Sequence, residues 1–183
     1  MKTEIETRFL EINKNHLIVT LQALGAADKG EVKLDEIIFY DKYLTWMKDG
    51  KLVKIRRKGD DIKLIFKNNK EKTIEGVQEI EFKIPNIAEV KSFLEAIGLI
   101  AYRTIEKYRH SFELDGAVID IDTWPKIPVY VEIEGDSAEN VKGIAEKLGF
   151  NWEDRFDGDP RVVFKKYGFD LDKIRTVTFD TFE

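Results

Sequence analysis

The feature that most constrains the fold of this chain is a two-residue alternation of charged and apolar side chains, which occurs in eight segments. Successive side chains of a β-strand point to opposite faces of its sheet, so each segment is predicted to be a strand with one charged face. The segments are TEIETRFLEI, EIIFYDKYLTW, KLVKIRRK, IKLIFK, QEIEFKI, YRTIEKYRHSFEL, AVIDIDTW and PVYVEIEG. Asp-Gly turn signals at 49–50 and 115–116 predict antiparallel hairpins.

Three further segments have the spacing of amphipathic helices: NKNHLIVTLQALG, NIAEVKSFLEAIG and DSAENVKGIAEKLG. Each begins near a residue that can cap a helix and ends at a glycine suited to a left-handed stop. A fourth, short helix is expected over 160–167, with Asp159 as its cap. The 183 residues therefore predict one domain, 1–183, of the α+β class and mainly antiparallel β. The segment 159–183 is expected to pack on or near the sheet.

The charged faces are segregated by sign from strand to strand. Carboxylates two residues apart occur on four of the predicted strands, as Glu4/Glu6, Glu79/Glu81, Asp120/Asp122 and Glu132/Glu134. Basic residues are grouped on other strands, as Lys54/Arg56, Lys63/Lys67 and Lys107/Arg109. An open sheet with one solvated face is the simpler interpretation, but it does not require this segregation. Eight strands are also the number that closes a small barrel. These observations favour closure of the sheet into an eight-stranded barrel, with the charges inside and the helices outside.

Carboxylates that converge inside a barrel need cations. Two carboxylates about 6 Å apart repel by roughly 3 kcal/mol at an effective dielectric constant of about 20. Oxygen ligands suit Mg²⁺ or Mn²⁺, and the chain has no cysteine and only two histidines with which to bind zinc. Lys and Arg on the other strands complement a small polyanion that itself binds a divalent cation. A triphosphate is therefore the predicted small-molecule substrate.

Composition excludes several other classes of protein. The formal net charge of −5 disfavours binding to a nucleic acid polymer. The absence of cysteine excludes a disulfide framework and fits a reducing compartment. Apolar stretches are too short to span a membrane, so a cytoplasmic location is expected. The oligomeric state is not determined by the sequence, and a homodimer is left open.

At the N-terminus, EIETRF resembles the Glu-x-Glu-x-Lys signature of the CYTH superfamily, the triphosphate tunnel metalloenzymes. That family includes class IV adenylyl cyclases, thiamine triphosphatases and inorganic triphosphatases. Further matches follow in the family's order: VKIR, LIFK, EIEF, EKYR, VIDID and VEIEG. The chain departs from the pattern at Arg8, where Lys is usual, at Lys54, where Arg is common, and at Phe39, where some triphosphatases have Tyr.

The resemblance implies an eight-stranded closed tunnel barrel with helices packed outside, and it also implies roles for the charged residues. The carboxylates expected to hold the metal are Glu4, Glu6, Glu132, Glu134 and Asp120. The residues expected to bind phosphate are Arg8, Lys54, Arg56, Lys67, Lys107 and Arg109. Catalytic roles are expected for Glu4, Glu6, Glu134 and Asp122. Glu79 and Glu81 are expected to pair with basic residues of the interior or to contact a second metal.

Three functions are compatible with these residues. The first is a metal-dependent triphosphatase that hydrolyses the terminal phosphoanhydride of an inorganic or organic triphosphate. The second is a class IV adenylyl cyclase, which converts ATP to cyclic AMP and pyrophosphate. The third is a non-catalytic module that binds a nucleotide or a polyphosphate.

Overall fold

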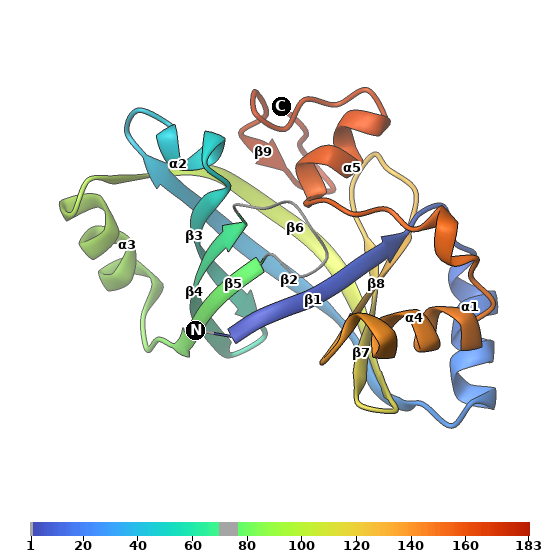
Figure 1. Ribbon diagram of the computed structural model, residues 1–183. Coiled ribbons are helices and arrows are strands. Elements are labelled where there is room, and N and C mark those ends of the chain that lie inside the picture. Colours follow the sequence, from blue (N-terminus) through green and yellow to red (C-terminus); the bar gives the residue numbers. More distant parts are fainter. Residues whose placement is uncertain (1, 70–76) are drawn as a thin grey trace.

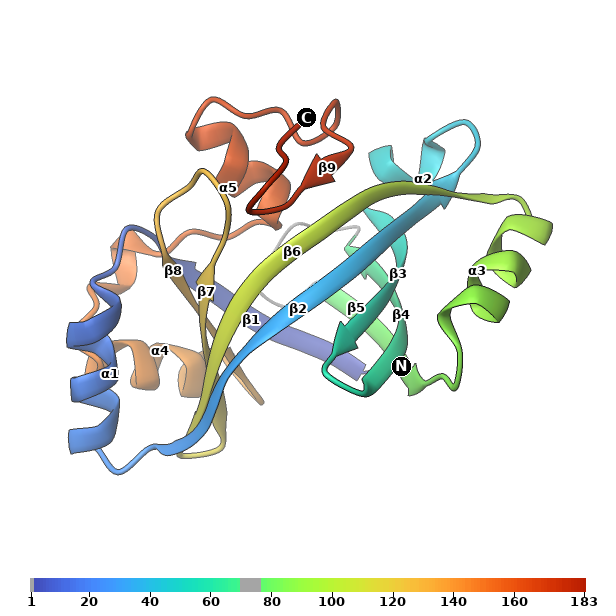
Figure 2. The ribbon, with the colours of Figure 1, turned by 180° about the vertical axis from the view of Figure 1, so that it is seen from behind.

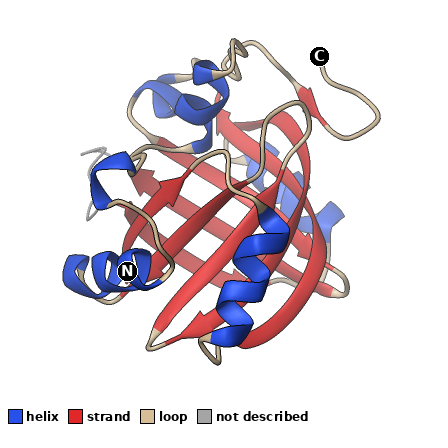
Figure 3. Cartoon of the chain, turned by 90° about the vertical axis from the view of Figure 1, so that its right-hand side faces the viewer, coloured by secondary structure: helices blue, strands red, loops and turns tan. Residues whose placement is uncertain are grey.

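The computed structural model describes residues 2–69 and 77–183, and the side chains of residues 5–69 and 78–183. Its described part contains one strongly curled sheet of nine strands, with helices on the outer side (Figures 1, 2 and 3). The strands are β1 (Lys2–Phe9), β2 (Ala27–Asp41), β3 (Lys51–Lys58), β4 (Asp61–Asn69), β5 (Val77–Lys83), β6 (Leu99–Leu114), β7 (Ala117–Thr123), β8 (Tyr130–Gly135) and β9 (Thr176–Val177). The predicted α+β class, mainly antiparallel, is confirmed.

The strand order is β2-β3-β4-β5-β1-β8-β7-β6-β9, and β2 pairs in addition with β6. Among the described strands, only the contact of β6 with β9 is parallel. The β2–β6 contact is long, extending from Ala27↔Glu113 to Asp41↔Leu99. The β1–β5 contact comprises three pairs within the described residues, from Lys2↔Glu79 to Glu4↔Val77. Because residues 70–76 beside it are not described, closure of this sheet into a tunnel stays a prediction.

Helices cover the outer face of the sheet and one of its ends. They are α1 (Lys14–Ala23), α2 (Thr45–Lys48), α3 (Ile87–Ala96), α4 (Ala138–Lys147), the 3₁₀ helix η1 (Trp152–Asp154) and α5 (Pro160–Lys166). The predicted caps are confirmed, since Asn13, Asn86, Ser137 and Asp159 each accept a backbone N–H in the first turn of a helix. No helix of the described ranges has both the length and the apolarity to cross a membrane.

The core lies in three places. Leu17 and Leu21 of α1 and Ile144 of α4 pack on the outer face of β7 and β8. Leu94 of α3 packs over the outer face of β2 and β3. The third cluster includes Phe164 of α5 and fills the end of the curled sheet beneath the C-terminal segment, at the top of Figure 1. The outer helices thus bury the apolar strand faces, and the charged faces are left to the interior.

The largest differences from the predicted strand boundaries are at the two ends of β2. β2 begins at Ala27, nine residues before the predicted start at Glu36. This early part was not predicted, because a register shift between Asp28 and Glu31 interrupts the alternation there. β2 also ends at Asp41, where the predicted strand continued to Trp46. The Asp41 carboxylate accepts the backbone N–H groups of residues 43, 45 and 46, so the chain turns into α2.

The C-terminal segment is fastened to β6. β9 pairs with β6 at Thr104↔Thr176 and Ile105↔Val177. The buried Arg103 donates from Nε to the carbonyl of Ile174 at 2.9 Å and from Nη2 to the carbonyl of Leu171. These contacts place the segment over the end of the interior.

Candidate functional site

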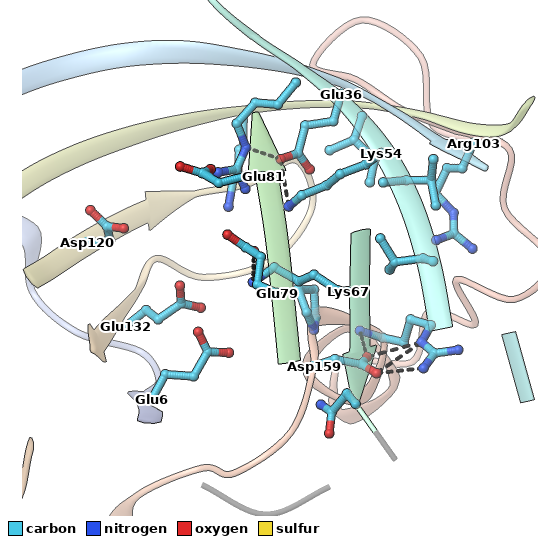
Figure 4. A pocket seen from close by; sticks show the side chains of 18 of the residues that line it. Glu6, Glu36, Lys54, Lys67, Glu79, Glu81, Arg103, Asp120, Glu132 and Asp159 are labelled. Atoms are coloured by element: carbon cyan, nitrogen blue, oxygen red, sulfur yellow. Dashed lines mark hydrogen bonds and ion pairs between the residues drawn. The ribbon is translucent and has the colours of Figure 1, made fainter. Parts of the chain in front are cut away.

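The inward faces of the strands line a cavity of about 750 Å³. Ten basic and eight acidic side chains of the described residues contribute to its wall, so the wall has an excess of positive charge although the whole chain has a net charge of −5. In Figure 4, Glu6, Glu132 and Asp120 lie on one side of the cavity, apart from Lys54, Lys67 and the strands that carry them. A volume of this size suits an organic ligand or a polyphosphate.

The acidic side of the cavity is built by β1 and β8. These strands pair Glu6 with Glu134 and Arg8 with Glu132. The Nη2 atom of Arg8 donates to Glu6 at 2.7 Å and to Glu132. Its Nη1 atom donates to the carbonyl of Gly158 at 2.5 Å. Burial would raise the pKa of Glu132, but the charges of Arg8 and Arg109 outweigh it and hold that pKa well below its usual value. Glu132 is therefore an anion held between two guanidinium groups.

The opposite wall contains a buried acid on β2 that the sequence analysis did not identify as a site residue. Glu36 is 3% exposed and pairs with Lys54 at 3.1 Å and with Arg56 at 2.6 Å. Burial alone would raise the pKa of Glu36, and the two cations lower it well below its usual value. Burial together with the nearby charge of Arg56 lowers the pKa of Lys54 to about 7. Lys54 consequently changes its charge near neutral pH.

A third group of charges lies on β6 and β7. Asp122 is fully buried and accepts hydrogen bonds from Lys107 at 2.7 Å and from Arg109 at 2.7 Å. Arg109 also donates to Asp120 and, at 3.2 Å, to Glu132. Burial raises the pKa of Asp120, whereas the charges of Arg109 and Lys107 overcome burial at Asp122 and lower its pKa. Arg109 thus lies among three carboxylates, and its orientation is determined by all of them.

The fourth group joins β4 to β5. Lys67 pairs with Glu79 at 3.0 Å, and Lys63 pairs with Glu81 at 2.6 Å. Both acids therefore form ion pairs with basic residues of the interior, which is one of the two roles expected for them. The charge of Lys67 outweighs burial and lowers the pKa of Glu79.

The structure brings most of the predicted site residues to one cavity. Those that line it are Glu6, Arg8, Lys54, Arg56, Lys67, Lys107, Arg109, Asp120, Glu132 and Glu134. Asp122 lies beneath this wall and holds Lys107 and Arg109 in place. Glu4 is part of β1, but its side chain is outside the part of the chain that the structure describes.

The charged lining residues that were not predicted as site residues include Glu36, Arg103, Asp159 and Arg161. Arg103 shares strand parity with Lys107 and Arg109, and this alternation could have identified it. Glu36 shares a strand face with Ile38 and Tyr40, so its face resembles an apolar one. Asp159 and Arg161 come from the C-terminal segment, where no alternation marks an inward face.

The donor chemistry of the acidic side fits a hard divalent cation, since Glu6, Glu132 and Glu134 supply only carboxylate oxygens. Among the described residues, no group of three or more His, Cys, Asp or Glu side chains is arranged to hold a metal ion. Mg²⁺ commonly binds one or two protein carboxylates and takes its other ligands from substrate phosphates and water. The carboxylates of β1 and β8 fit that kind of site, in which the substrate completes the coordination.

A family model described as the CYTH domain matches residues 2–155. Solved structures share the fold. A proposed adenylate cyclase from Vibrio parahaemolyticus is 15% identical, with a TM-score of 0.79 over 90% of this chain and 98% of that chain. The PH1012 protein of Pyrococcus horikoshii OT3 is 19% identical, with a TM-score of 0.72 over 84% of this chain and 94% of that chain.

A third solved structure, from Hippeastrum, is a proposed adenylyl cyclase, HpAC1, for which a dominant triphosphatase activity is described. It is 15% identical, with a TM-score of 0.63 over 90% of this chain and 95% of that chain. Among curated proteins, none matches the sequence. The family model covers more than half of the chain, and the charged strand faces on which the resemblance rested lie within the matched residues. The chain therefore belongs to the CYTH-domain family.

Proposed function

We propose that this protein is a divalent-metal-dependent enzyme that binds a triphosphate in the cavity and hydrolyses its terminal phosphoanhydride. The observation that carries the proposal is the distribution of charge in the cavity, with guanidinium and ammonium groups from β1, β3, β4 and β6 around one space. Such groups bind phosphate oxygens well, and Arg does so with two parallel hydrogen bonds. The triphosphatase activity described for the Hippeastrum relative is consistent with this assignment.

We further propose that the curled sheet acts as a closed tunnel around the substrate. The pairing of β2 with β6 and of β1 with β5 supports closure, because it gives each of the strands β1 to β8 two neighbours within the described residues. A tunnel excludes bulk water from its charges, and the interaction of those charges with phosphate is correspondingly stronger.

In this mechanism, Arg56, Lys67, Lys107 and Arg109 bind the phosphate oxygens and neutralise the charge that develops on the leaving pyrophosphate. Glu36 and Asp122 hold these cations in fixed positions. Glu6 and Glu134 orient the attacking water and accept its proton. Glu6, Glu132 and Glu134 would hold the metal ion, which when bound polarises the phosphoryl oxygens.

A class IV adenylyl cyclase is the second candidate function. It is favoured by the apolar end of the cavity, where Tyr40, Leu52 and Trp124 could accommodate a nucleoside beside the phosphate-binding groups. In that reaction the ribose 3′-hydroxyl attacks the α-phosphorus of ATP and pyrophosphate leaves. The products separate the two candidates: orthophosphate indicates hydrolysis, and cyclic AMP with pyrophosphate indicates cyclisation.

The first test is a substrate panel of tripolyphosphate, thiamine triphosphate, ATP and GTP, each with Mg²⁺ and with Mn²⁺.

Arg56→Gln is expected to lower kcat/KM about 100-fold, because it removes a charged phosphate donor from the cavity. Arg57→Gln is the matched control, since Arg57 is the next residue on β3 and its side chain is exposed. Glu132→Gln is expected to abolish metal-dependent turnover.

Equal losses in Arg56→Gln and Arg57→Gln would contradict the assignment of the cavity as the active site. Tight triphosphate binding without turnover under either metal would instead favour the non-catalytic binding module.

A further inference from the structure

Arg8 is a basic residue of the cavity wall to which the proposed mechanism assigns no step. It is 4% exposed, and on β1 it is paired with Glu132 of β8. The backbone N–H of Phe156 donates to the carbonyl of Arg8 at 2.8 Å, so the chain is held from a second side as well. The fold therefore fixes the backbone of Arg8, and only its side chain is able to change partners.

The guanidinium of Arg8 lies between two carboxylates that would hold the metal ion. Its Nη2 atom donates to Oε1 of Glu6 at 2.7 Å and to Oε2 of Glu132. The other oxygen of Glu132, Oε1, accepts a hydrogen bond from Arg109 at 3.2 Å. In Figure 4 the carboxylates of Glu6 and Glu132 lie next to each other on one side of the cavity, as a shared partner requires. Both oxygens of Glu132 thus already have a cationic partner.

We propose that Arg8 is an internal cation that competes with the divalent metal ion for Glu6 and Glu132. This inference rests on the proposed function, because it concerns the metal site of that mechanism. A divalent cation and a guanidinium that bind the same carboxylate oxygens repel each other, and the repulsion is strong in the buried wall of the cavity. Metal binding therefore requires Arg8 to leave the two carboxylates.

The partners of Arg8 distinguish it from the cations of the opposite wall. Lys54 and Arg56 both pair with Glu36, an acid of β2 to which no metal role is assigned. A metal ion on β1 and β8 leaves those ion pairs intact. The competition is consequently a property of one guanidinium, and it differs from a general effect of the positive charge in the cavity.

The present contacts of Arg8 do not use all of its donors. Nη1 donates to the carbonyl of Gly158 at 2.5 Å, whereas the buried Nε atom has no hydrogen-bond partner in the described part of the structure. A buried donor without a partner is costly. A phosphate oxygen in the cavity could accept from Nε, since the fork of Arg suits phosphate groups. An Arg8 displaced by the metal ion therefore has a partner in the polyphosphate of the proposed reaction.

The experiment titrates the protein with Mn²⁺ alone, and electron paramagnetic resonance measures the free ion. For Arg8→Gln we expect the Kd for Mn²⁺ to fall at least tenfold relative to wild type, because glutamine has no charge and leaves Glu6 and Glu132 to the metal ion. Damage to the fold would weaken metal binding, so it cannot produce this gain. For Arg8→Lys, which keeps the charge on a single nitrogen, we expect a gain of about threefold.

Two further variants serve as controls. Arg56→Gln removes the same charge from the same cavity, but Arg56 pairs with Glu36 on the opposite wall. We expect it to change the Kd for Mn²⁺ by less than threefold. Glu132→Gln in the Arg8→Gln background is expected to abolish the gain, because it removes one of the two carboxylates.

A Kd for Mn²⁺ in Arg8→Gln that stays within twofold of wild type overturns the inference. An equal gain in Arg56→Gln, or a gain that persists when Glu132 is also replaced, overturns it as well. Metal-dependent hydrolysis by the wild type together with an unchanged Mn²⁺ affinity in Arg8→Gln refutes the inference alone. Tighter Mn²⁺ binding by Arg8→Gln, in a protein whose wild type hydrolyses no triphosphate, supports the inference and refutes the proposed hydrolysis.

Discussion

Lys54 is a cavity residue whose charge changes with pH in the neutral range. It is 8% exposed, and burial together with the charge of Arg56 lowers its pKa to about 7. Its ammonium form is the one that binds phosphate. As pH rises through 7, a growing fraction of the free protein has a neutral Lys54 and must take up a proton when a polyanion binds.

We therefore expect the affinity for tripolyphosphate to fall by up to about tenfold per pH unit above 7 relative to a Lys54→Arg variant. Arg retains its charge over this range, so the variant removes the contribution of the lysine. Titration calorimetry at pH 6, 7 and 8 measures both affinities. The comparison cancels the ionisation of tripolyphosphate itself, which strengthens binding as pH rises. Parallel pH profiles for wild type and Lys54→Arg would contradict a titrating Lys54.

At the scale of elements, the C-terminal segment depends on one buried side chain of β6. The Arg103 guanidinium binds the carbonyls of Leu171 and Ile174, and these bonds lie next to the short β9. Arg103→Leu keeps an apolar side chain at this position and leaves both carbonyls without their donor. Hydrogen bonds to a charged group contribute about 1.5–3 kcal/mol each.

Arg103→Leu is therefore expected to lower the free energy of unfolding by about 3–6 kcal/mol and to expose residues 168–183 to proteolysis. Urea denaturation and limited proteolysis with mass spectrometry measure the two effects. Arg57→Leu serves as the control on β3. If the tail of Arg103→Leu stays as resistant to protease as that of wild type, Arg103 does not fasten it.

The strands that alternate without interruption were predictable from the sequence, and so were the helices with a cap and a terminal glycine. β3, β4 and β7 follow the predicted segments closely because charged and apolar side chains alternate along most of each strand. The beginning of β2 was not predictable, since its register shift breaks the alternation. β9 has two residues and forms through its contact with β6, so no local pattern marks it.

The residues of the candidate site were also predictable only in part. The charged interior follows from strand parity, because a β-strand assigns alternate side chains to one face whatever the rest of the fold does. The apolar end of the cavity does not follow from parity, because Arg161 lies in α5 and Leu171 in the turn after it, where no strand alternation marks an inward face. Glu36 was missed for another reason. Its apolar neighbours on the same face of β2 line the apolar end of the cavity, so the sequence pattern of this face resembles that of a strand face buried in the core.

At the scale of the whole molecule, the sign of the charge in the cavity opposes that of the chain. Like charges gathered in the interior repel one another in the free protein, and a bound polyanion relieves that repulsion. Ligands that bind only the folded state stabilise it by mass action, by about 2.7 kcal/mol at a concentration 100 times Kd.

We expect tripolyphosphate at that concentration to raise Tm by about 5–11 °C, and the same concentration of sulfate to raise it by much less. Differential scanning fluorimetry at constant ionic strength gives both values. The gain should be smaller in Arg56→Gln and unchanged in Arg57→Gln. An equal rise of Tm with sulfate would indicate a general salt effect and no specific polyanion site.

The guanidinium of Arg8 has one consequence for how this chain can vary. It spans two carboxylates, of Glu6 and Glu132, and the carbonyl of Gly158 in the stretch that leads to α5. Lysine, the usual residue at this place in the family, ends in a single nitrogen and cannot bridge all three partners. We therefore expect the side chain at position 8 and the stretch near Gly158 to depend on each other, so that a lysine at position 8 requires another donor for the Gly158 carbonyl.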